Sequence, residues 1–320
     1  MSSRAPAFSP PHARGSGQIR GYHAIREREV SSLPSVSAAE IAEKVRELCI
    51  AAAYELPQDV ISAFRRALEI EESPQGRAIF EELLRNAEVA AGERIPYCQD
   101  TGVAVVFVKK GPRVTVEGGT LTDAINEGVR RGYTEGYLRA SMVEFPLFER
   151  RNTGDNTPPV IHIEESDRDE LAITLVPKGA GSENMSRLVM LSPSAGWEGV
   201  KKEVVDTVLR AGANPCPPII VGVGIGGSFE KCAYLAKKAL LRNVGDPNPD
   251  PRVATLEREL LEDVNKTGIG PAGLGGTVTA LAVHIETYPA HIASLPVAIN
   301  LGCHAYRHKT AVLLGGESHG

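Results

Sequence analysis

Residues 211–230 read Ala-Gly-Ala-Asn-Pro-Cys-Pro-Pro-Ile-Ile-Val-Gly-Val-Gly-Ile-Gly-Gly-Ser-Phe-Glu. Prolines on both sides of Cys216 restrict the backbone there, so we expect this thiol to be held extended and outside any helix. The apolar run 219–221 predicts a short strand, and the glycines after it predict a loop that can approach a ligand closely. Ser228 then opens a helix. A rigidly held thiol beside such a loop predicts a binding site.

Two further cysteines lie in similar settings, each where a strand meets a loop. Cys98 lies in Ile-Pro-Tyr-Cys-Gln-Asp-Thr-Gly, residues 95–102, and Cys303 lies in Asn-Leu-Gly-Cys-His-Ala, residues 300–305. The separations of 118 and 87 residues between the three cysteines are too long for a zinc ribbon or a Cys-x-x-Cys redox pair. Three such thiolates, if they converge, would suit an iron–sulfur cluster with one iron left open as a Lewis acid.

Four separate blocks, in the same order along the chain, carry a resemblance to a known family. They are residues 95–102, Lys-Gly-Ala-Gly-Ser-Glu-Asn-Met at 178–185, Pro-Cys-Pro-Pro and its glycines at 215–227, and Ala-Ile-Asn-Leu-Gly-Cys-His at 298–304. Together they resemble class I, iron–sulfur-dependent fumarate hydratase, in particular the α subunit of its two-subunit form. The closely similar α subunit of L(+)-tartrate dehydratase fits equally well. The resemblance runs from about residue 35 to about residue 310.

The resemblance implies a [4Fe–4S] cluster whose iron ligands are Cys98, Cys216 and Cys303. It also implies that Gln99 and Asp100 contact the substrate, with Asp100 tuning or performing a proton transfer. A structural hydrogen bond from Asp100 to its own loop is the alternative.

Further site residues follow from the same family blocks. Arg139, in Gly-Tyr-Leu-Arg-Ala-Ser-Met at 136–142, aligns with an arginine that clamps a substrate carboxylate, a task that suits its bidentate fork. Gly179 and Gly181 would offer backbone amides to the substrate. His291 lies in a matching block before Cys303 and is predicted as a catalytic pocket residue.

The implied activity is that of a hydro-lyase, the reversible hydration of fumarate to malate at the open iron of the cluster. L(+)-tartrate dehydration is the alternative. In the family, the remaining cationic clamps and the proposed proton-transfer threonine come from a smaller swivelling domain. The sequence ends at Gly320 without room for that domain, so we expect a separate β subunit and, by the habit of the family, an α2β2 assembly.

Other classes of function stay open at this point. Residues 222–227 fit the Gly-x-Gly-x-x-Gly dinucleotide fingerprint, which makes a nicotinamide-dependent dehydrogenase a remote alternative. The same pattern recurs at residues 268–273 with a proline inside it, so the pattern is weak. A zinc or thiol enzyme would need histidines near the cysteines, and a non-catalytic scaffold would use the cysteines for packing alone.

Composition excludes several partners. The 320-residue chain has a net charge of −5 and no basic block, so nucleic acid is not an expected partner. No apolar run approaches the length of a membrane span. Five cysteines, an odd number, argue against a disulfide scaffold and predict a reducing, cytoplasmic location. Cys49 and Cys232 fall inside predicted helices and are expected to pack.

The periodicity predicts an α+β fold with a helical region at 35–92, followed by a mixed sheet flanked by helices in one large catalytic domain, residues 35–320. Ser37 and Glu40 form a capping box at the first helix, and Pro57 and Pro74 open two more. We also expect a hairpin from 159–164 and 171–176, and a buried helix at 277–285. Residues 1–34 are predicted to be a disordered leader, with a transit peptide as the alternative.

Overall fold

The structure, a computed structural model, describes residues 33–314. The leader predicted at residues 1–34 therefore lies outside the described residues, apart from its last two. The helices are α1 (Ala38–Tyr54), α2 (Gln58–Ile70), α3 (Pro74–Glu93), α4 (Leu121–Glu135), α5 (Ala180–Glu183), α6 (Gly196–Ala211), α7 (Phe229–Ala239) and α8 (Pro251–Asn265), with two 3₁₀ turns, η1 (Pro193–Ala195) and η2 (Pro271–Gly273). The strands are β1 (Ser35–Ser37), β2 (Val103–Lys110), β3 (Thr115–Glu117), β4 (Val160–Glu165), β5 (Leu171–Lys178), β6 (Arg187–Leu191), β7 (Ile219–Gly227), β8 (Ala280–Ala290), β9 (Leu295–Gly302) and β10 (Lys309–Leu314). These elements confirm the predicted α+β class.

The three N-terminal helices begin where the capping signals predict. The Ser37 hydroxyl accepts a hydrogen bond from the Glu40 amide at 3.1 Å at the start of α1. At α3 the Ser73 hydroxyl accepts from the Gly76 amide, and Pro74 occupies the first turn, where its missing N–H costs nothing. Local sequence signals therefore place these helices correctly.

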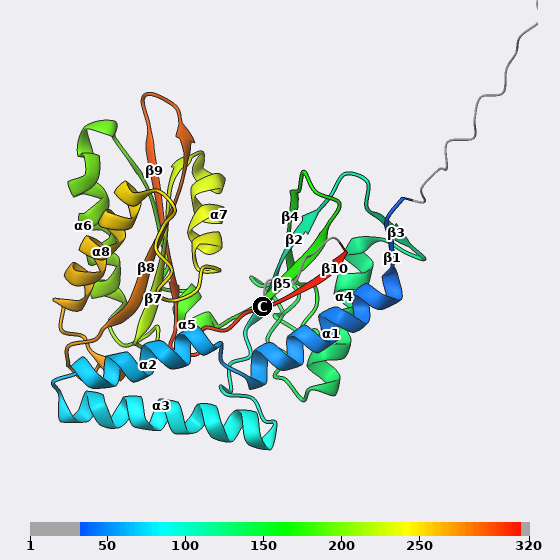
Figure 1. Ribbon diagram of the computed structural model, residues 1–320, viewed down its shortest axis with the longest axis horizontal. Helices are drawn as coiled ribbons and strands as arrows, with labels where there is room; N and C mark the ends of the chain where they lie inside the picture. The colour runs from blue at the N-terminus through cyan, green and yellow to red at the C-terminus, as the bar shows by residue number, and fades with distance from the viewer. Residues whose placement is uncertain (1–32, 315–320) are drawn as a thin grey trace, which may run out of the picture. The chain divides into compact units, whose positions relative to one another are not determined.

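The strands form two four-stranded sheets and a small parallel pair, β1 and β3 (Figure 1). The first sheet has the order β10-β5-β2-β4, with β4 parallel to β2 and β5 antiparallel to it. The predicted hairpin of residues 159–164 and 171–176 is therefore wrong, because β2 lies between those two strands. Residues 104–108 of β2 are all buried, and the strand is central in its sheet because it pairs with β4 on one edge and β5 on the other.

The second sheet has the order β6-β9-β7-β8. Its strand β8 occupies the stretch where a buried helix was predicted at 277–285, and that prediction is wrong. An apolar run that is buried on both faces does not show whether its period is that of a helix or of a strand. Here β8 pairs in parallel with β7 along most of its length, and this pairing decides its conformation.

The glycines after Ile219 continue strand β7 instead of forming a ligand loop. A Cβ atom on Gly222 would come within 2.1 Å of the Ala236 carbonyl oxygen, and one on Gly224 within 2.0 Å of the Cys232 carbonyl oxygen. Helix α7 therefore packs directly onto the backbone of β7. The expectation that these two glycines admit a ligand is wrong. Because residues 222–227 are part of a strand, they do not form the glycine-rich loop that a dinucleotide-binding site requires.

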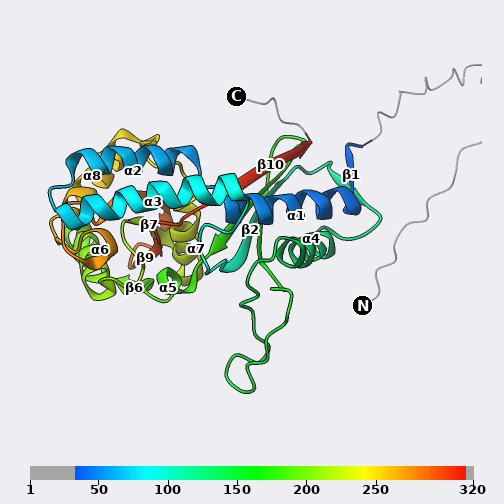
Figure 2. The ribbon, with the colours of Figure 1, turned by 90° about the horizontal axis from the view of Figure 1, so that it is seen from below.

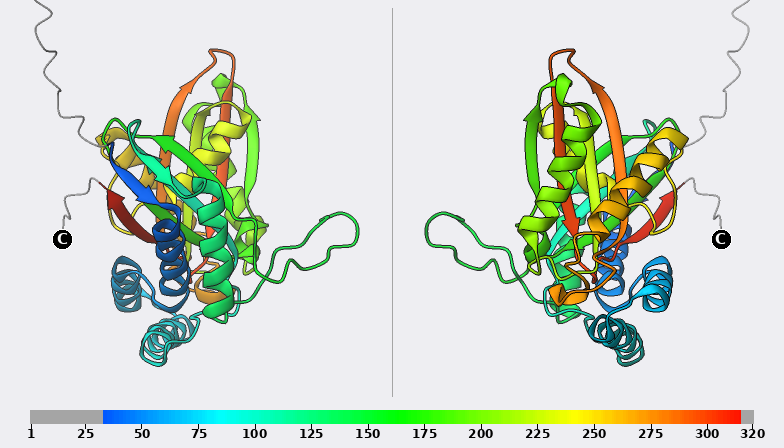
Figure 3. Two further views of the ribbon diagram at one scale, coloured as in Figure 1. Left: turned by 90° about the vertical axis from the view of Figure 1, so that its right-hand side faces the viewer. Right: turned by 90° about the vertical axis from the view of Figure 1, so that its left-hand side faces the viewer.

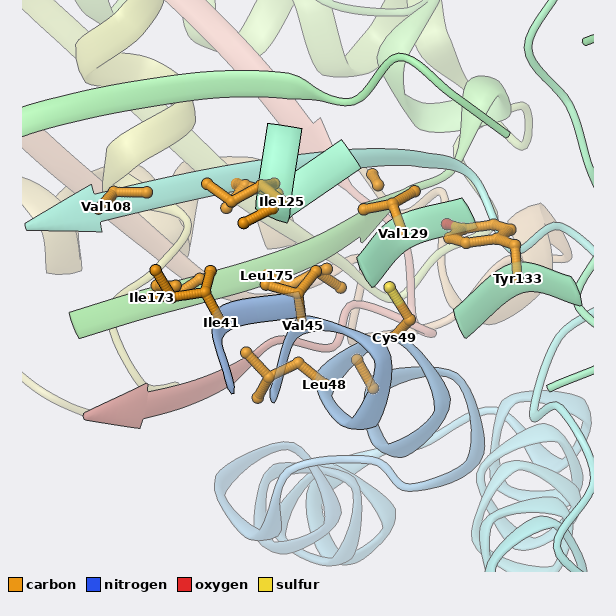
Figure 4. Close-up of a cluster of buried hydrophobic side chains, with 14 of the residues drawn as sticks. Ile41, Val45, Leu48, Cys49, Val108, Ile125, Val129, Tyr133, Ile173 and Leu175 are labelled. Atoms are coloured by element: carbon orange, nitrogen blue, oxygen red, sulfur yellow. The ribbon is translucent and has the colours of Figure 1, made fainter. Parts of the chain in front are cut away.

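Helices cover both sheets. Side chains from α1 and α4 pack with β2 and β5 of the first sheet, and Figure 4 shows Ile41 and Val45 of α1 beside Ile173 and Leu175 of β5. Helices α6 and α8 contribute to the core of the second sheet, and α7 lies against β7, β8 and β9 (Figures 1 and 2). As predicted, Cys49 and Cys232 are fully buried packing residues.

A long loop between α4 and β4 extends away from the helices and sheets (Figures 2 and 3, in green). A single bridge between Val143 and Asn152 joins its two sides. Phe145, Leu147 and Phe148 are exposed in it. No helix among residues 33–314 has the length and apolar character needed to cross a membrane.

Candidate functional site

Cys216 and Cys303 lie on loops whose backbones are joined directly. The Cys216 carbonyl accepts a hydrogen bond at 3.2 Å from the amide of His304, the residue that follows Cys303. The Cys216 backbone is outside any helix, as predicted, but it is left-handed (φ 56°) instead of extended. A left-handed non-glycine residue costs on the order of 1–3 kcal/mol, and such strain is concentrated at functional sites.

The loop that carries Cys98 is fixed by the residue before it. The buried Tyr97 donates its amide to the Ala53 carbonyl of α1 at 2.9 Å, and its own carbonyl accepts from the Asn86 side chain of α3. The Tyr97 hydroxyl faces Nδ1 of His304 at 3.4 Å. The Cys98 loop therefore contacts the loop of Cys303.

The charge of Cys98 affects both other thiols. Burial raises the pKa of Cys216, and the charges of Cys98 and Asp100 add to this rise. Burial likewise raises the pKa of Cys303; Arg307 and Lys178 oppose the rise, and Cys98 adds to it. Loops that lie far apart in the sequence thus bring three free thiols into one neighbourhood.

This donor set can be tested against the implied metal group. The described residues contain no group of three or more His, Cys, Asp or Glu side chains arranged around a single ion. The thiolates of an iron–sulfur cluster hold a body of several atoms, so they stand farther apart than ligands of one ion. Three free thiols on three adjoining loops, with cationic neighbours, have the chemistry that such a cluster requires.

Asp100 connects the Cys98 loop to the glycine segment that follows β5. Its Oδ1 accepts from the Gly102 amide at 3.0 Å, and its Oδ2 accepts from the Ala180 amide at 2.9 Å. A Cβ atom on Gly179 would lie 3.2 Å from Oδ2, and one on Gly181 would lie 3.0 Å from the Asn214 carbonyl oxygen. The glycine segment therefore lies between Asp100 and the Cys216 loop.

Gln99 and Arg139 lie at the same place. Gln99 is exposed next to Cys98. The Arg139 carbonyl accepts from the Thr101 hydroxyl at 2.9 Å, and the Arg139 side chain is exposed. Among the ion pairs formed within residues 33–314, none involves Arg139. Its guanidinium is therefore available to an anion.

The two ends of the long loop between α4 and β4 are held against the Cys98 loop. Asn156 is fully buried, and its Nδ2 donates to the Gly102 carbonyl at 3.0 Å. Its Oδ1 accepts from the amides of Ser141 at 2.7 Å and Met142 at 3.2 Å. These bonds hold both sides of the loop, and Arg139 at its start, against the Cys98 loop.

His291 lies elsewhere in the chain. It is exposed in the turn between β8 and β9, and its Nδ1 accepts from the Ala293 amide. Cys303 follows the opposite end of β9 (Figure 1), and eight residues of strand span about 25 Å. The structure does not bring His291 to the cysteines of its own chain, so its predicted catalytic role there is not supported by its position.

Sequence reasoning missed a charged network beneath the glycine segment. The buried Lys178 Nζ lies 2.8 Å from the Ser182 hydroxyl and 3.2 Å from Glu183 Oε2. Lys237 pairs with the same carboxylate, and the Asn300 amide donates to it at 2.9 Å. All of these residues except Lys237 lie within the quoted blocks, and a polar Asn300 near the end of an apolar strand was the signal that could have found them.

The network shifts the pKa of both central groups. Burial alone would raise the pKa of Glu183, but Lys178 and Lys237 outweigh it and hold this pKa at about 2. Burial lowers the pKa of Lys178, and Glu183 opposes that fall. The carboxylate is therefore a structural counter-ion for two lysines.

A cavity of about 670 Å³ lies on the other side of this network, between α7 and the first sheet. Lys178, Ala180 and Glu183 form one edge, while Val105, Val160 and Phe229 are among the apolar residues of its wall. An apolar wall does not suit a dicarboxylate, so the candidate site is the region around the three cysteines.

Comparisons with known proteins agree on one group. Residues 42–312 match the family described as fumarate hydratase (Fumerase). The chain is 45% identical over 273 residues to the putative L(+)-tartrate dehydratase subunit alpha of Methanocaldococcus jannaschii, covering 84% of this chain and 95% of that one. It is 36% identical over 262 residues to the L(+)-tartrate dehydratase subunit alpha of Escherichia coli strain K12, covering 81% and 86%.

Proposed function

The chain belongs to the fumarate hydratase (Fumerase) family, and from this premise we propose that it is the iron–sulfur α subunit of a two-subunit enzyme that hydrates fumarate to malate reversibly. It is a hydro-lyase subunit by family. The observation that carries the proposal is the meeting of three cysteine loops with Asp100 and the glycine segment. L(+)-tartrate dehydration is the second candidate, favoured by the names of the relatives.

Cys98, Cys216 and Cys303 would hold a [4Fe–4S] cluster. When bound, this group supplies Lewis-acid chemistry that makes a hydroxyl a better leaving group. The fit of the donor set supports the assignment, since all three thiols are free and lie on adjoining loops.

The residues around the cysteines would bind and orient the dicarboxylate. Both oxygens of Asp100 accept backbone hydrogen bonds, which fixes the carboxylate beside Cys98 and leaves each oxygen a lone pair for a substrate proton. We assign Arg139 to one substrate carboxylate, because a guanidinium binds carboxylates through two parallel hydrogen bonds. Gln99 and the amides of Gly179 and Gly181 would complete the contacts from this chain.

A second polypeptide would complete the site. A dicarboxylate carries two negative groups, and the Arg139 guanidinium can bind only one of them. The relatives are named as alpha subunits, which supports a separate β subunit that supplies the remaining cations, in an α2β2 assembly. The free thiols among the described residues support a reducing, cytoplasmic location.

The first test is the iron and acid-labile sulfide content of chain reconstituted without oxygen. We expect about four of each per chain in the native sequence. Cys216→Ser should lose most of this iron because a cluster ligand is gone, while Cys232→Ser, at a buried packing position, should keep it. A native chain without iron, or equal iron in both variants, would contradict the proposal.

The second test decides the substrate. The cluster-loaded chain combined with its β subunit is assayed with fumarate and L(+)-tartrate side by side, and the larger kcat/KM identifies the physiological class. We expect fumarate to be preferred. A preference for tartrate would establish the second candidate, and ordinary turnover by the loaded chain alone would contradict the need for a β subunit.

A further inference from the structure

Arg307 is a buried cation that the proposed mechanism does not use. It lies in the segment between β9 and β10, four residues after Cys303, and only 2% of its surface is exposed. Arginine is almost never fully buried unless it is paired, because taking its charge out of water is unfavourable. Its surroundings should therefore contain a counter-charge.

The protein groups around Arg307 supply no such charge. Its Nη1 donates to the Ala305 carbonyl at 3.0 Å and its Nη2 to the Asp100 carbonyl at 3.2 Å. Its Nε is buried without a hydrogen-bond partner. Within residues 33–314, no Asp or Glu oxygen lies within 4.0 Å of the guanidinium.

The missing carboxylate partner of Arg307 is unusual when it is compared with Lys178, which is also buried among the described residues. Lys178 is 3% exposed, and its ammonium lies 3.2 Å from Glu183. The partly buried Arg242 likewise pairs with Glu257 at 2.6 Å. The fold supplies carboxylates to cations that need them, and it supplies none to Arg307.

Arg307 contacts the segments that carry Cys98 and Cys303, whose thiols would become negative thiolates on binding a metal. Its hydrogen bonds join the Asp100 end of the Cys98 loop to the segment that follows Cys303. Arg307 itself lies only four residues after Cys303 in the chain. A site loaded with three thiolates would be negative beside it.

We propose that Arg307 is the counter-ion of the loaded three-cysteine site, and this inference rests on the proposed cluster. The buried guanidinium is uncompensated in the empty chain and becomes compensated when the thiolates hold the cluster. A fixed cation also favours the more negative, reduced form of a redox group, so Arg307 raises the reduction potential of the site.

The test compares Arg307→Met, Arg307→Lys and a control, Arg242→Met, in the full chain with and without reconstituted cluster. Three quantities are measured: Tm of the empty and the loaded chain, the reduction potential, and the rate of iron loss to a chelator. Arg307→Met should leave the Tm of the empty chain unchanged or higher, because a buried charge has been removed. It should lower the reduction potential and weaken iron retention by about tenfold.

The other two variants separate charge from structure. Arg307→Lys keeps the charge and should retain most of the native potential. Arg242→Met leaves the buried Glu257 without its partner, so it should lower the Tm of both states equally and leave the potential unchanged.

Two results would overturn the inference. If Arg307→Met lowers the Tm of empty and loaded chain equally and leaves potential and iron retention unchanged, Arg307 only tethers two carbonyls. If Arg307→Met does not fold, the decision rests on Arg307→Lys, which keeps the charge. A reduction potential in Arg307→Lys well below that of the native chain would then contradict the inference, because the charge alone would not set the potential. A native chain that binds no iron would instead remove the proposed function itself, so the two failures are distinguishable.

Discussion

At the scale of single residues, the candidate site is built from backbone contacts that fix a few side chains. Asp100 accepts hydrogen bonds from two amides, and Arg307 donates one to the Asp100 carbonyl. The single Glu183 carboxylate pairs with both Lys178 and Lys237. The lysine–carboxylate pairs at the site depend on the ionised form of Glu183, and this charge responds to pH.

Glu183 gives a pH-dependent prediction. Its pKa is about 2 in the folded chain, below the value of about 4.3 expected when unfolded, so its stabilisation is present above about pH 4.3 and is lost as pH falls toward 2. Glu183→Gln should lower the free energy of unfolding at pH 7, and the difference from the native chain should shrink progressively below pH 4.3. Urea unfolding between pH 7 and pH 3 measures it.

Glu88→Gln is the matched control for this prediction. Glu88 is exposed on α3, and the ion pairs found within the described residues do not include it. Its replacement should leave the free energy of unfolding nearly unchanged at every pH. A Glu183→Gln effect that stays constant down to pH 3 would show that its charge is not the cause.

At the scale of elements, the contact between α7 and β7 determines how the second sheet packs. Gly222 and Gly224 let the helix lie directly on the strand backbone. Because α7 also contacts β8 and β9, a change at this contact affects the whole sheet.

A small substitution at this contact should therefore be costly. Gly224→Ala places a Cβ atom where the Cys232 carbonyl oxygen lies, so we expect a loss of about 3 kcal/mol in the free energy of unfolding, from strain on packed backbone. Chemical denaturation measures this loss.

Gly92→Ala is the control, since a Cβ atom there meets nothing within 4 Å. In helix α3 this change should stabilise by about 0.5–1 kcal/mol, through helix propensity. Equal effects of the two substitutions would mean that α7 does not press on β7.

The elements also show what a sequence can predict here. The helices α1 to α3 follow from caps and apolar period, which are local properties. The pairing of β4 with β2, and the strand conformation of β8, depend on partners that are distant in the sequence, so local patterns predicted a hairpin and a helix instead. The cysteines could be found because their proline and glycine surroundings are unusual, whereas Arg307 depends on burial that no local pattern reveals.

At the scale of the whole described chain, the cysteine loops belong to both sheets. Cys98 precedes β2 of the first sheet, Cys216 precedes β7 of the second, and Cys303 lies on the connection from β9 to β10, which joins the two. A group bound by all three thiols would therefore link the two sheets.

This arrangement predicts that binding of the cluster stabilises the whole fold. A ligand that binds the folded chain alone raises its stability by mass action, so the loaded chain should have a higher Tm than the chain stripped by a chelator. Hydrogen exchange should slow in residues 95–102, 213–218 and 302–308 after loading, and it should change little in the exposed loop around Phe145. Equal Tm and equal exchange in both forms would contradict the link.

The crossing from β9 to β10 also has a consequence for the order of assembly. Cys98 and Cys303 are 205 residues apart in the sequence, and the strands beside their loops pair with distant segments: β2 with β5, β10 with β5, and β9 with β7. Contacts between such distant segments form slowly because long loops must close first. We therefore expect the three thiols to come together late in folding, and the cluster to be loaded onto a chain that is already folded.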